Sequence, residues 1–408
     1  MNKRLITGFL WAVALVVTLN VQAQTDSAKQ MPTYKVAIFA PLYLDSVFSG
    51  TTFKYKQALP KFIVPAAEFV QGAEIALDSM RMGNENIEAY IYDSRAYTKT
   101  IPSLISSKAL DGVDLIIGAV KDADYKQLAD FALAKNVPFI SATYPNDGGV
   151  TGNPFTVIIN STLKAHCEAI YSYLLQNHGT DLIFLCRKKG TQEDKIAAYF
   201  KALNEQDGKA LLNIQTINAD SLVISDIFKN KLDSNRHSVI LGGSLDEAFA
   251  TGLTSACFNL QKKYPMTLIG MPNWDGFAAF QKKDEFQDFP VYFTTPYFNI
   301  KADNYSKLLT SAYLKKFKIK PSDMAFKGFE ITYMFTKLLT RYPNDFMAHI
   351  NDKTDKVFCD YNFRPVMLKK TNTTPDYFEN KHLYFIKLLN GSTVRAFQDG
   401  PGSSSSKK

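Results

Sequence analysis

Short, continuous apolar segments alternate with amphipathic ones along almost the whole chain. Residues 35–40 (KVAIFA) form an apolar run that Pro41 ends, which predicts a buried strand. Pro65 then begins a segment whose apolar residues recur at helical spacing on one face. Strands that are apolar throughout are covered on both faces, and intervening helices favour parallel pairing. The sequence therefore predicts an α/β fold built on doubly wound parallel sheets.

The alternation runs through two successive blocks. The first block continues with strand-like segments at 87–92, 113–117 and 138–140 and helical segments at 101–110 and 125–133. The second block has strand-like segments at 155–159, 182–186, 212–217, 239–241 and 267–269, with helical segments that include 163–175 and 196–203. A chain of 408 residues is too long for one ordinary core. We therefore expect two doubly wound lobes.

Parallel sheets of this kind bind ligands at the carboxyl ends of their strands, where loops and helix N-termini converge. Position alone therefore selects a set of candidate residues, and an ordinary surface loop is the alternative for each. The set consists of Tyr43, Lys121, Asp122, Thr143, Tyr144, Arg187, Gly243, Ser244, Asn273, Trp274 and Asp275.

The first 23 residues have the pattern of a cleavable export signal. Lys3 and Arg4 precede an uncharged apolar run at 5–19, and Val21-Gln22-Ala23 supplies the small residues of a cleavage site after Ala23. The alternative is an uncleaved anchor, because the run is barely long enough to span a bilayer of roughly 30 Å. The first cysteine is Cys167, which excludes lipid attachment at the cleavage point. No later segment approaches membrane-spanning length, so we expect no membrane insertion after cleavage.

Charge and cysteine content exclude further classes. Removing residues 1–23 takes away Lys3 and Arg4 and no acid, so the formal net charge falls from +8 to +6. The charges are dispersed, which is typical of a solvated surface and not of a nucleic-acid-binding protein. The four cysteines are far apart and lie in apolar contexts, which favours four buried thiols and leaves one disulfide as the alternative. Residues 399–408 form a Gly/Ser tail that we expect to be disordered.

Motifs of catalysis and cofactor binding are missing from the sequence. The five histidines are scattered, with no pair at metal-ligand spacing, and each is interpreted as a surface or capping residue. The sequence contains no GxSxG, Walker or GxGxxG pattern. We therefore predict no catalytic residue, no metal and no cofactor, and a protein that is not an enzyme.

Five segments carry a resemblance to a known family. They are 36–42 (VAIFAPL), 69–78 (FVQGAEIALD), 113–118 (VDLIIG), 135–141 (KNVPFIS) and 328–333 (GFEITY). In order and spacing they resemble the type I periplasmic solute-binding proteins, in the branch that serves amino-acid ABC transporters and related receptor ligand-binding regions. The resemblance covers about 34–397. It implies that Gly72 lets its helix lie close to the sheet.

The resemblance also implies how the chain is divided. Lobe one would hold 33–156 and 295–358, and lobe two 157–294 and 359–398. Three crossovers would join the lobes, near 158–160, 293–295 and 357–358. Family members close around a ligand by rotating the lobes about such crossovers.

Amino-acid binders of this family usually hold the ligand carboxylate with a serine and backbone N–H groups after the fourth strand. They add small hydroxyl residues after the fifth. Residues 118–124 contain no serine, so Lys121 could serve as the direct anion partner. Asp122 is alternatively an N-cap of the following helix. Thr143 and Tyr144 follow the fifth strand, and the missing serine weakens the expectation of a simple α-amino acid.

Lobe two and the crossover contribute the remaining candidates. Arg187 follows an apolar strand, a place suited to bidentate anion recognition, and a solvent-exposed arginine is the alternative. Ser244 and Asn273 stand at strand ends. Trp274 could stack on a ring or sugar of the ligand, or close the interlobe core. Tyr297 lies just past the second crossover, where it could face the cleft.

Two functions of different class follow. The first is a periplasmic substrate-binding protein that captures a small polar solute, amino-acid-like or anionic, in an interlobe cleft. Its partner would be an ABC permease or a membrane sensor. We expect no nucleic-acid partner. The second is an envelope or cell-wall interaction protein that retains the fold without transport.

Overall fold

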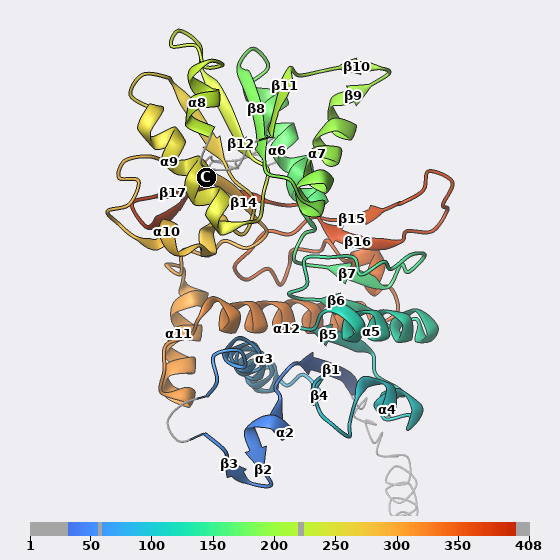
Figure 1. Ribbon diagram of the computed structural model, residues 1–408. Helices are drawn as coiled ribbons and strands as arrows, with labels where there is room; N and C mark the ends of the chain where they lie inside the picture. The colour runs from blue at the N-terminus through green and yellow to red at the C-terminus, as the bar shows by residue number, and fades with distance from the viewer. Residues whose placement is uncertain (1–31, 56–58, 219–223, 397–408) are drawn as a thin grey trace, which may run out of the picture.

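The computed structural model describes residues 32–55, 59–218 and 224–396. Two lobes are stacked on one another, each built on a seven-stranded sheet (Figure 1). The predicted signal at 1–23 and the predicted tail at 399–408 lie outside the described residues. Over the residues that are described, none of the helices combines the length and the apolar character needed to cross a bilayer.

The lobe-one sheet consists mainly of parallel strands from the first 160 residues. In spatial order its strands are β15 (Phe363–Val366), β16 (Tyr377–Asn380), β7 (Thr156–Ile158), β6 (Phe139–Ser141), β5 (Leu115–Gly118), β1 (Tyr34–Ala40) and β4 (Ile87–Asp93). The helices of this lobe are α2 (Leu44–Val47), α3 (Val64–Met82), α4 (Ile101–Ser106), α5 (Asp122–Lys135), α11 (Asn304–Phe317), α12 (Asp323–Arg341) and η2 (Phe346–His349). The short pair β2 (Phe48–Ser49) and β3 (Thr52–Phe53) follows α2.

Helices cover both faces of the lobe-one sheet. Successive side chains of β1 point to opposite faces, so alternate residues of this strand pack against different helices. Val36 and Ile38 pack with Phe69 of α3 and Phe335 of α12. Ala37 and Phe39 pack instead with residues of α4 and α5. The continuous burial of β1 therefore follows from two apolar layers, as its uninterrupted apolar run predicts.

The lobe-two sheet has the same doubly wound character. In spatial order its strands are β11 (Ile214–Asn218), β8 (Leu182–Arg187), β12 (Ser238–Gly242), β13 (Met266–Ile269), β14 (Val291–Thr295), β17 (Tyr384–Leu389) and β18 (Ser392–Arg395). The helices are α6 (Leu163–Asn177), α7 (Thr191–Asn204), α8 (Ile224–Lys229), α9 (Glu247–Leu260), η1 (Trp274–Gly276) and α10 (Ala278–Gln281), and a short pair is formed by β9 (Glu205–Gln206) and β10 (Lys209–Ala210). The prediction of two parallel-sheet α/β lobes is confirmed.

The boundaries between the lobes differ from those expected. β7 and β16 pair in the lobe-one sheet through Val157 and Phe378, and β15 pairs with β16. Residues 157–158 and 363–380 thus belong with lobe one, although the resemblance implied lobe two. The chain passes between the sheets at 159–162, 296–303 and 381–383, so the third passage does not lie at 357–358.

Gly72 does not have the role that the resemblance implied. A Cβ atom on Gly72 would lie 2.0 Å from the carbonyl oxygen of Ala325. The missing side chain therefore lets α3 approach α12, and not the sheet. α12 runs across lobe one beside α3, as Figure 1 shows.

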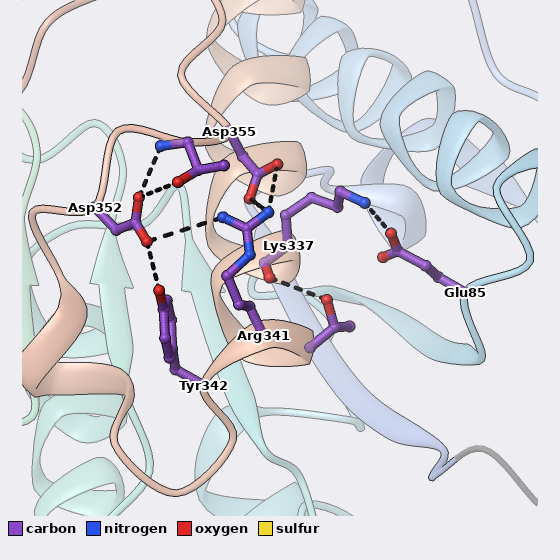
Figure 2. Close-up of polar contacts among 8 residues, drawn as sticks. Glu85, Lys337, Arg341, Tyr342, Asp352 and Asp355 are labelled. Carbon is purple, nitrogen blue, oxygen red and sulfur yellow. Dashed lines mark hydrogen bonds and ion pairs between the residues drawn. The ribbon is translucent and has the colours of Figure 1, made fainter.

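Charged residues fix the C-terminal half of α12 (Figure 2). Lys337 forms an ion pair with Glu85, which precedes β4. Arg341 lies 3.0 Å from an oxygen of Asp355, and the hydroxyl of Tyr342 donates to Asp352 at 2.8 Å. These contacts join α12 and its C-cap residue to the segment before β4 and to the segment after the helix.

All four cysteines, Cys167, Cys186, Cys257 and Cys359, are free and buried. The interpretation as four buried thiols is confirmed. Burial raises the pKa of each thiol, which keeps it in the unreactive protonated form.

Candidate functional site

One carboxylate holds the loop after β1 against the end of β4. Asp93 accepts hydrogen bonds from the backbone N–H groups of Leu42 (2.9 Å), Tyr43 (3.1 Å) and Leu44 (2.7 Å). Tyr43 has a left-handed backbone (φ 53°), and its ring packs edge-on against Phe62. The structure therefore places Tyr43 at the carboxyl edge of the sheet, with its ring against its own lobe.

The loops after β5 and β6 meet at the same edge. The hydroxyl of Tyr144 donates to Asp122 at 3.1 Å, and the carbonyl of Thr143 accepts from the side chain of Asn160 at 2.8 Å. Burial and the hydrogen bond to Asp122 raise the pKa of Tyr144. Lys121 is exposed beside them. Four of the sequence-predicted residues are thus brought together.

The alternative role of Asp122 as a helix N-cap is wrong. α5 begins at Asp122 itself, which has a φ of 54°, and the cap position belongs to Lys121. Neither side chain hydrogen-bonds to the first N–H groups of this helix in the structure described. The Asp122 carboxylate is turned to Tyr144 instead.

An ion pair that the sequence analysis did not select lies beside this group. Arg95 follows β4, and its guanidinium lies 3.3 Å from Asp124 in the first turn of α5. Burial raises the pKa of Asp124, whereas Arg95 opposes this increase. The signal in the sequence was the position of Ser94 and Arg95 directly after a strand end.

Arg187 of lobe two is already paired. Its guanidinium contacts Asp194 of α7, and Nε donates to the carbonyl of Lys188 at 3.3 Å. Its side chain is 13% exposed, so it is not the solvent-exposed arginine of the alternative interpretation. It lines a hollow of about 720 Å³ whose walls all come from lobe two, and not a cleft shared by the lobes.

Ser244 and Trp274 are interior residues of lobe two. Ser244 has no exposed surface, and its hydroxyl donates to Glu193 at 2.6 Å. Trp274 also has no exposed surface, and its Nε1 donates to the carbonyl of Ser244 at 2.9 Å. The indole fits against Gly242 and Gly270, where a Cβ atom would lie 2.2 and 2.3 Å from it. In this conformation neither Ser244 nor Trp274 can contact a solute, and Trp274 closes the core of lobe two.

Asn273, by contrast, is exposed at the end of β13. Its side-chain nitrogen donates to the carbonyl of Leu245 at 2.9 Å, which ties the loop after β13 to the loop after β12. The next turn carries Asp275, which lines a pocket that Asp323 of lobe one also lines.

A pocket of about 380 Å³ lies where the second passage leaves β14. Its walls come from lobe two, from lobe one and from the connecting segment, and they include Asp275, Thr295, Tyr297, Lys301, Asp323 and Thr393. This volume is within the range of small-molecule sites, about 300–1,000 Å³. Tyr297 and Asp275 are the two residues of the predicted set among the pocket-lining residues described.

Groups of opposite charge surround Tyr297. The ammonium of Lys327 lies 4.9 Å from the centre of the Tyr297 ring. Burial lowers the pKa of Lys327 and raises that of Asp275, and each charge favours the ionised form of the other. Among the described contacts no ion pair joins these two residues, whereas Lys301 and Asp323 are paired at 2.7 Å. The Tyr297 hydroxyl is buried and lacks a hydrogen-bond partner among the described residues.

A fully buried carboxylate supports this pocket from lobe one. Glu330 of α12 accepts the backbone N–H groups of Phe358 (2.8 Å) and Cys359 (2.5 Å) and the hydroxyl of Tyr361 (2.9 Å). Burial raises the pKa of Glu330, and these hydrogen bonds oppose the increase. One turn of α12 thus carries both Lys327 at the pocket and the carboxylate that fixes the segment behind it.

The arrangement suits recognition of a small molecule that carries both charges. The ammonium of Lys327 can pair with an anionic group, and the carboxylate of Asp275 with a cationic one. Position at a strand end had selected Asp275 as a candidate, whereas Lys327 had not been selected. The signal for Lys327 is its place, with Glu330, in the otherwise uncharged stretch 325–335 of α12.

A family model described as periplasmic binding protein matches residues 65–357.

Solved structures share the fold at low identity. A putative branched-chain amino acid ABC transporter from Rhodospirillum rubrum is 11% identical and covers 89% of this chain and 100% of its own, with a TM-score of 0.64. An ABC transporter substrate-binding protein from Desulfitobacterium hafniense in complex with Leu is 11% identical, with the same coverages and a TM-score of 0.55. A branched-chain amino acid ABC transporter periplasmic ligand-binding protein from Burkholderia xenovorans LB400 is 13% identical and covers 90% of this chain and 92% of its own, with a TM-score of 0.57. No curated protein matches the sequence.

Proposed function

Because the chain belongs to the periplasmic binding protein family, we propose that it captures a small polar solute between its two lobes. It would deliver the solute to an ABC permease or present it to a membrane sensor. Location in the periplasm, after cleavage of the signal at Ala23, is part of this proposal. Two of the structures named above are a substrate-binding protein and a periplasmic ligand-binding protein, which supports binding without catalysis.

The observation that carries the proposal is the pocket around Tyr297. Asp275 reaches it from lobe two, and Lys327 lies beside it in lobe one. Charged groups that are partly desolvated and not paired with each other are costly unless a ligand or water satisfies them. A zwitterionic, amino-acid-like solute would satisfy both charges and hold the lobes together. The leucine in the Desulfitobacterium hafniense structure is a ligand of this kind.

Thermal unfolding with a panel of amino acids, small peptides, sugars and nucleosides tests the proposal. A solute present at 100 times its Kd should add about 2.7 kcal/mol of stability. We expect zwitterions to shift the unfolding temperature and neutral sugars to leave it unchanged. A panel without any shift would contradict solute capture.

Variants then locate the site of the solute that is found. Lys327→Met and Asp275→Asn should each weaken binding at least tenfold, because each removes one charge-assisted contact. Lys307→Met, on the exposed face of α11, is the matched control and should bind as the parent does. If Thr143→Ala and Tyr144→Phe weaken binding instead, the solute occupies the loops after β5 and β6, and the pocket assignment is wrong.

An exposed apolar segment favours a second function, an envelope or cell-wall interaction protein. The large apolar side chains described in the segment after β1 that are at least one third exposed are Leu44, Phe48, Phe53, Tyr55, Leu59 and Phe62. Exposed patches of this kind mark interaction sites. Co-sedimentation of the protein with purified peptidoglycan, lost on Phe48→Ser and Phe53→Ser, would support this function. Solute binding without co-sedimentation would exclude it.

A further inference from the structure

Two histidines and one aspartate meet at the amino-terminal edge of the lobe-two sheet. His178 follows α6, Asp181 directly precedes β8, and His237 directly precedes β12. The Nδ1 atoms of His178 and His237 lie 2.7 and 2.8 Å from the same oxygen, Oδ2 of Asp181. The two imidazole rings are stacked, with centroids 5.6 Å apart. One ligand atom from each residue therefore lies within 4.8 Å of the other two.

The cluster is partly shielded but can be reached from solvent. The side chains of His178, Asp181 and His237 are 11%, 22% and 33% exposed. Imidazole nitrogen and carboxylate oxygen are the donor types that zinc and neighbouring transition metals take in proteins. A hard alkali or alkaline-earth cation would need more oxygen ligands than these three residues offer.

The outer nitrogens of the two rings each have a hydroxyl partner. Nε2 of His178 lies 3.2 Å from the hydroxyl of Tyr173, and Nε2 of His237 lies 3.0 Å from that of Thr267. A hydroxyl can donate or accept, so it can satisfy either tautomer of a neutral imidazole. Without a metal, each Nδ1–H donates to Asp181, and each Nε2 accepts from its hydroxyl. With a metal on Nδ1, the ring proton resides on Nε2 and is donated to the hydroxyl. Metal-ligating histidines characteristically have such an outer partner.

We propose that His178, Asp181 and His237 bind one divalent transition-metal ion such as Zn²⁺. The ligands are both Nδ1 atoms and the Asp181 carboxylate, and water takes the fourth tetrahedral position. With metal–ligand distances near 2.0–2.1 Å, adjacent ligand atoms stand about 3.3 Å apart. The carboxylate must therefore move by roughly half an ångström from its present hydrogen bonds. Asp181 lies in the short turn between α6 and β8, and the two Nδ1 atoms must reach the same separation from each other.

This site is separate from the proposed solute pocket. The cluster lies where β8 and β12 begin, whereas in the pocket Asp275 follows β13 and Thr295 is the last residue of β14. A bound ion would join the turn after α6 to the start of β12, two segments that are 56 residues apart at Asp181 and His237. Its role is therefore to brace lobe two.

Titration of the full chain, prepared without a histidine tag, with Zn²⁺ against a chromophoric chelator tests the proposal. We expect one equivalent to bind, and Co²⁺ in its place to give the intense visible absorption of a four-coordinate site. His237→Gln and Asp181→Asn each remove a ligand. Their Zn²⁺ affinity should fall by more than the roughly 10- to 100-fold that loss of an outer partner costs.

Two further variants make the outcome decisive. Thr267→Val keeps all three ligands and should weaken Zn²⁺ binding about tenfold, so the proposal is tested even if a ligand variant does not fold. His349→Gln removes a histidine on the other lobe and should bind as the parent does. Absence of one-equivalent binding, or His237→Gln binding Zn²⁺ as tightly as the parent, would show that the cluster is a hydrogen-bond network only.

Discussion

A Cβ atom on Gly328 of α12 would lie 1.9 Å from the carbonyl oxygen of Phe69 in α3. The reciprocal contact is equally close, since a Cβ atom on Gly72 of α3 would lie 2.0 Å from the carbonyl oxygen of Ala325. The two helices therefore touch through their backbones. Lys327 and Glu330 occupy the same turns of α12, so this crossing also sets the position of the lobe-one wall of the pocket.

We predict that Gly328→Ala destabilises the protein. The added methyl group meets backbone and not a flexible side chain, so the helices must separate, and overpacking of this kind costs about 1–3 kcal/mol or more. Urea denaturation measures the loss as a lower midpoint. Gly179→Ala is the control, because nothing lies within 4 Å of its added Cβ atom. Equal stability of Gly328→Ala and the parent would mean that the helices are not in backbone contact.

The burial of Trp274 leads to a second prediction. Trp274→Ala should cost about 3–5 kcal/mol, because it leaves a large cavity in the lobe-two core. Solute affinity, measured calorimetrically where the variant is folded, should change little. Trp274 is the only tryptophan after the predicted signal, so its fluorescence should also be unaffected by solute. Loss of affinity without loss of stability would restore the earlier interpretation of Trp274 as a ligand-stacking residue.

Local patterns were sufficient to predict most of the fold. Strands such as β1 and β12 are apolar throughout because both faces are covered, and this shows in the sequence without knowledge of the partners. The order of strands within a sheet could not be predicted from local patterns. β16 returns to β7 through Phe378 and Val157, more than 200 residues apart, and nothing within either segment specifies that pairing. The lobe boundaries were therefore the part that was misplaced.

The sequence predicted which candidate residues stand at strand ends, but not which of their side chains are exposed to solvent. Strand ends correctly located Asp122 and Tyr144 at one edge of lobe one. The same rule selected Trp274, whose indole is buried because Gly242 and Gly270 leave room for it. The burial of the Trp274 indole therefore depends on which strands are neighbours in the sheet. His178 and His237 appeared scattered for the same reason, since β8 and β12 bring them together only in the folded sheet.

His166 provides a pH-dependent prediction. It is fully buried, its Nδ1 lies 2.7 Å from the hydroxyl of Thr294, and burial lowers its pKa to about 3. Between about pH 6.5 and 3 the unfolded chain binds a proton here that the folded chain does not. The stabilising effect of this neutral histidine is therefore present above pH 6.5 and is lost as the pH falls.

We expect the stability difference between the parent and His166→Asn to shrink on acidification by up to about 1.4 kcal/mol per pH unit within that window. Urea denaturation at several pH values measures it. A stability difference that stays constant from pH 7 to 4 would show that His166 is protonated in the folded state.

Asp352 should act in a lower pH window. Hydrogen bonds from Thr354 and then from Tyr342 lower its pKa to about 2. Its ionised form therefore stabilises the fold above about pH 4, the ordinary range of an aspartate, and this effect is lost as the pH falls through 2. Asp352→Asn should be less stable than the parent at pH 7, and the two should converge below pH 4. Tyr342→Phe removes one of the hydrogen bonds and should shift that convergence to higher pH. Convergence already complete at pH 5–6 would show that the difference does not arise from a lowered pKa of Asp352.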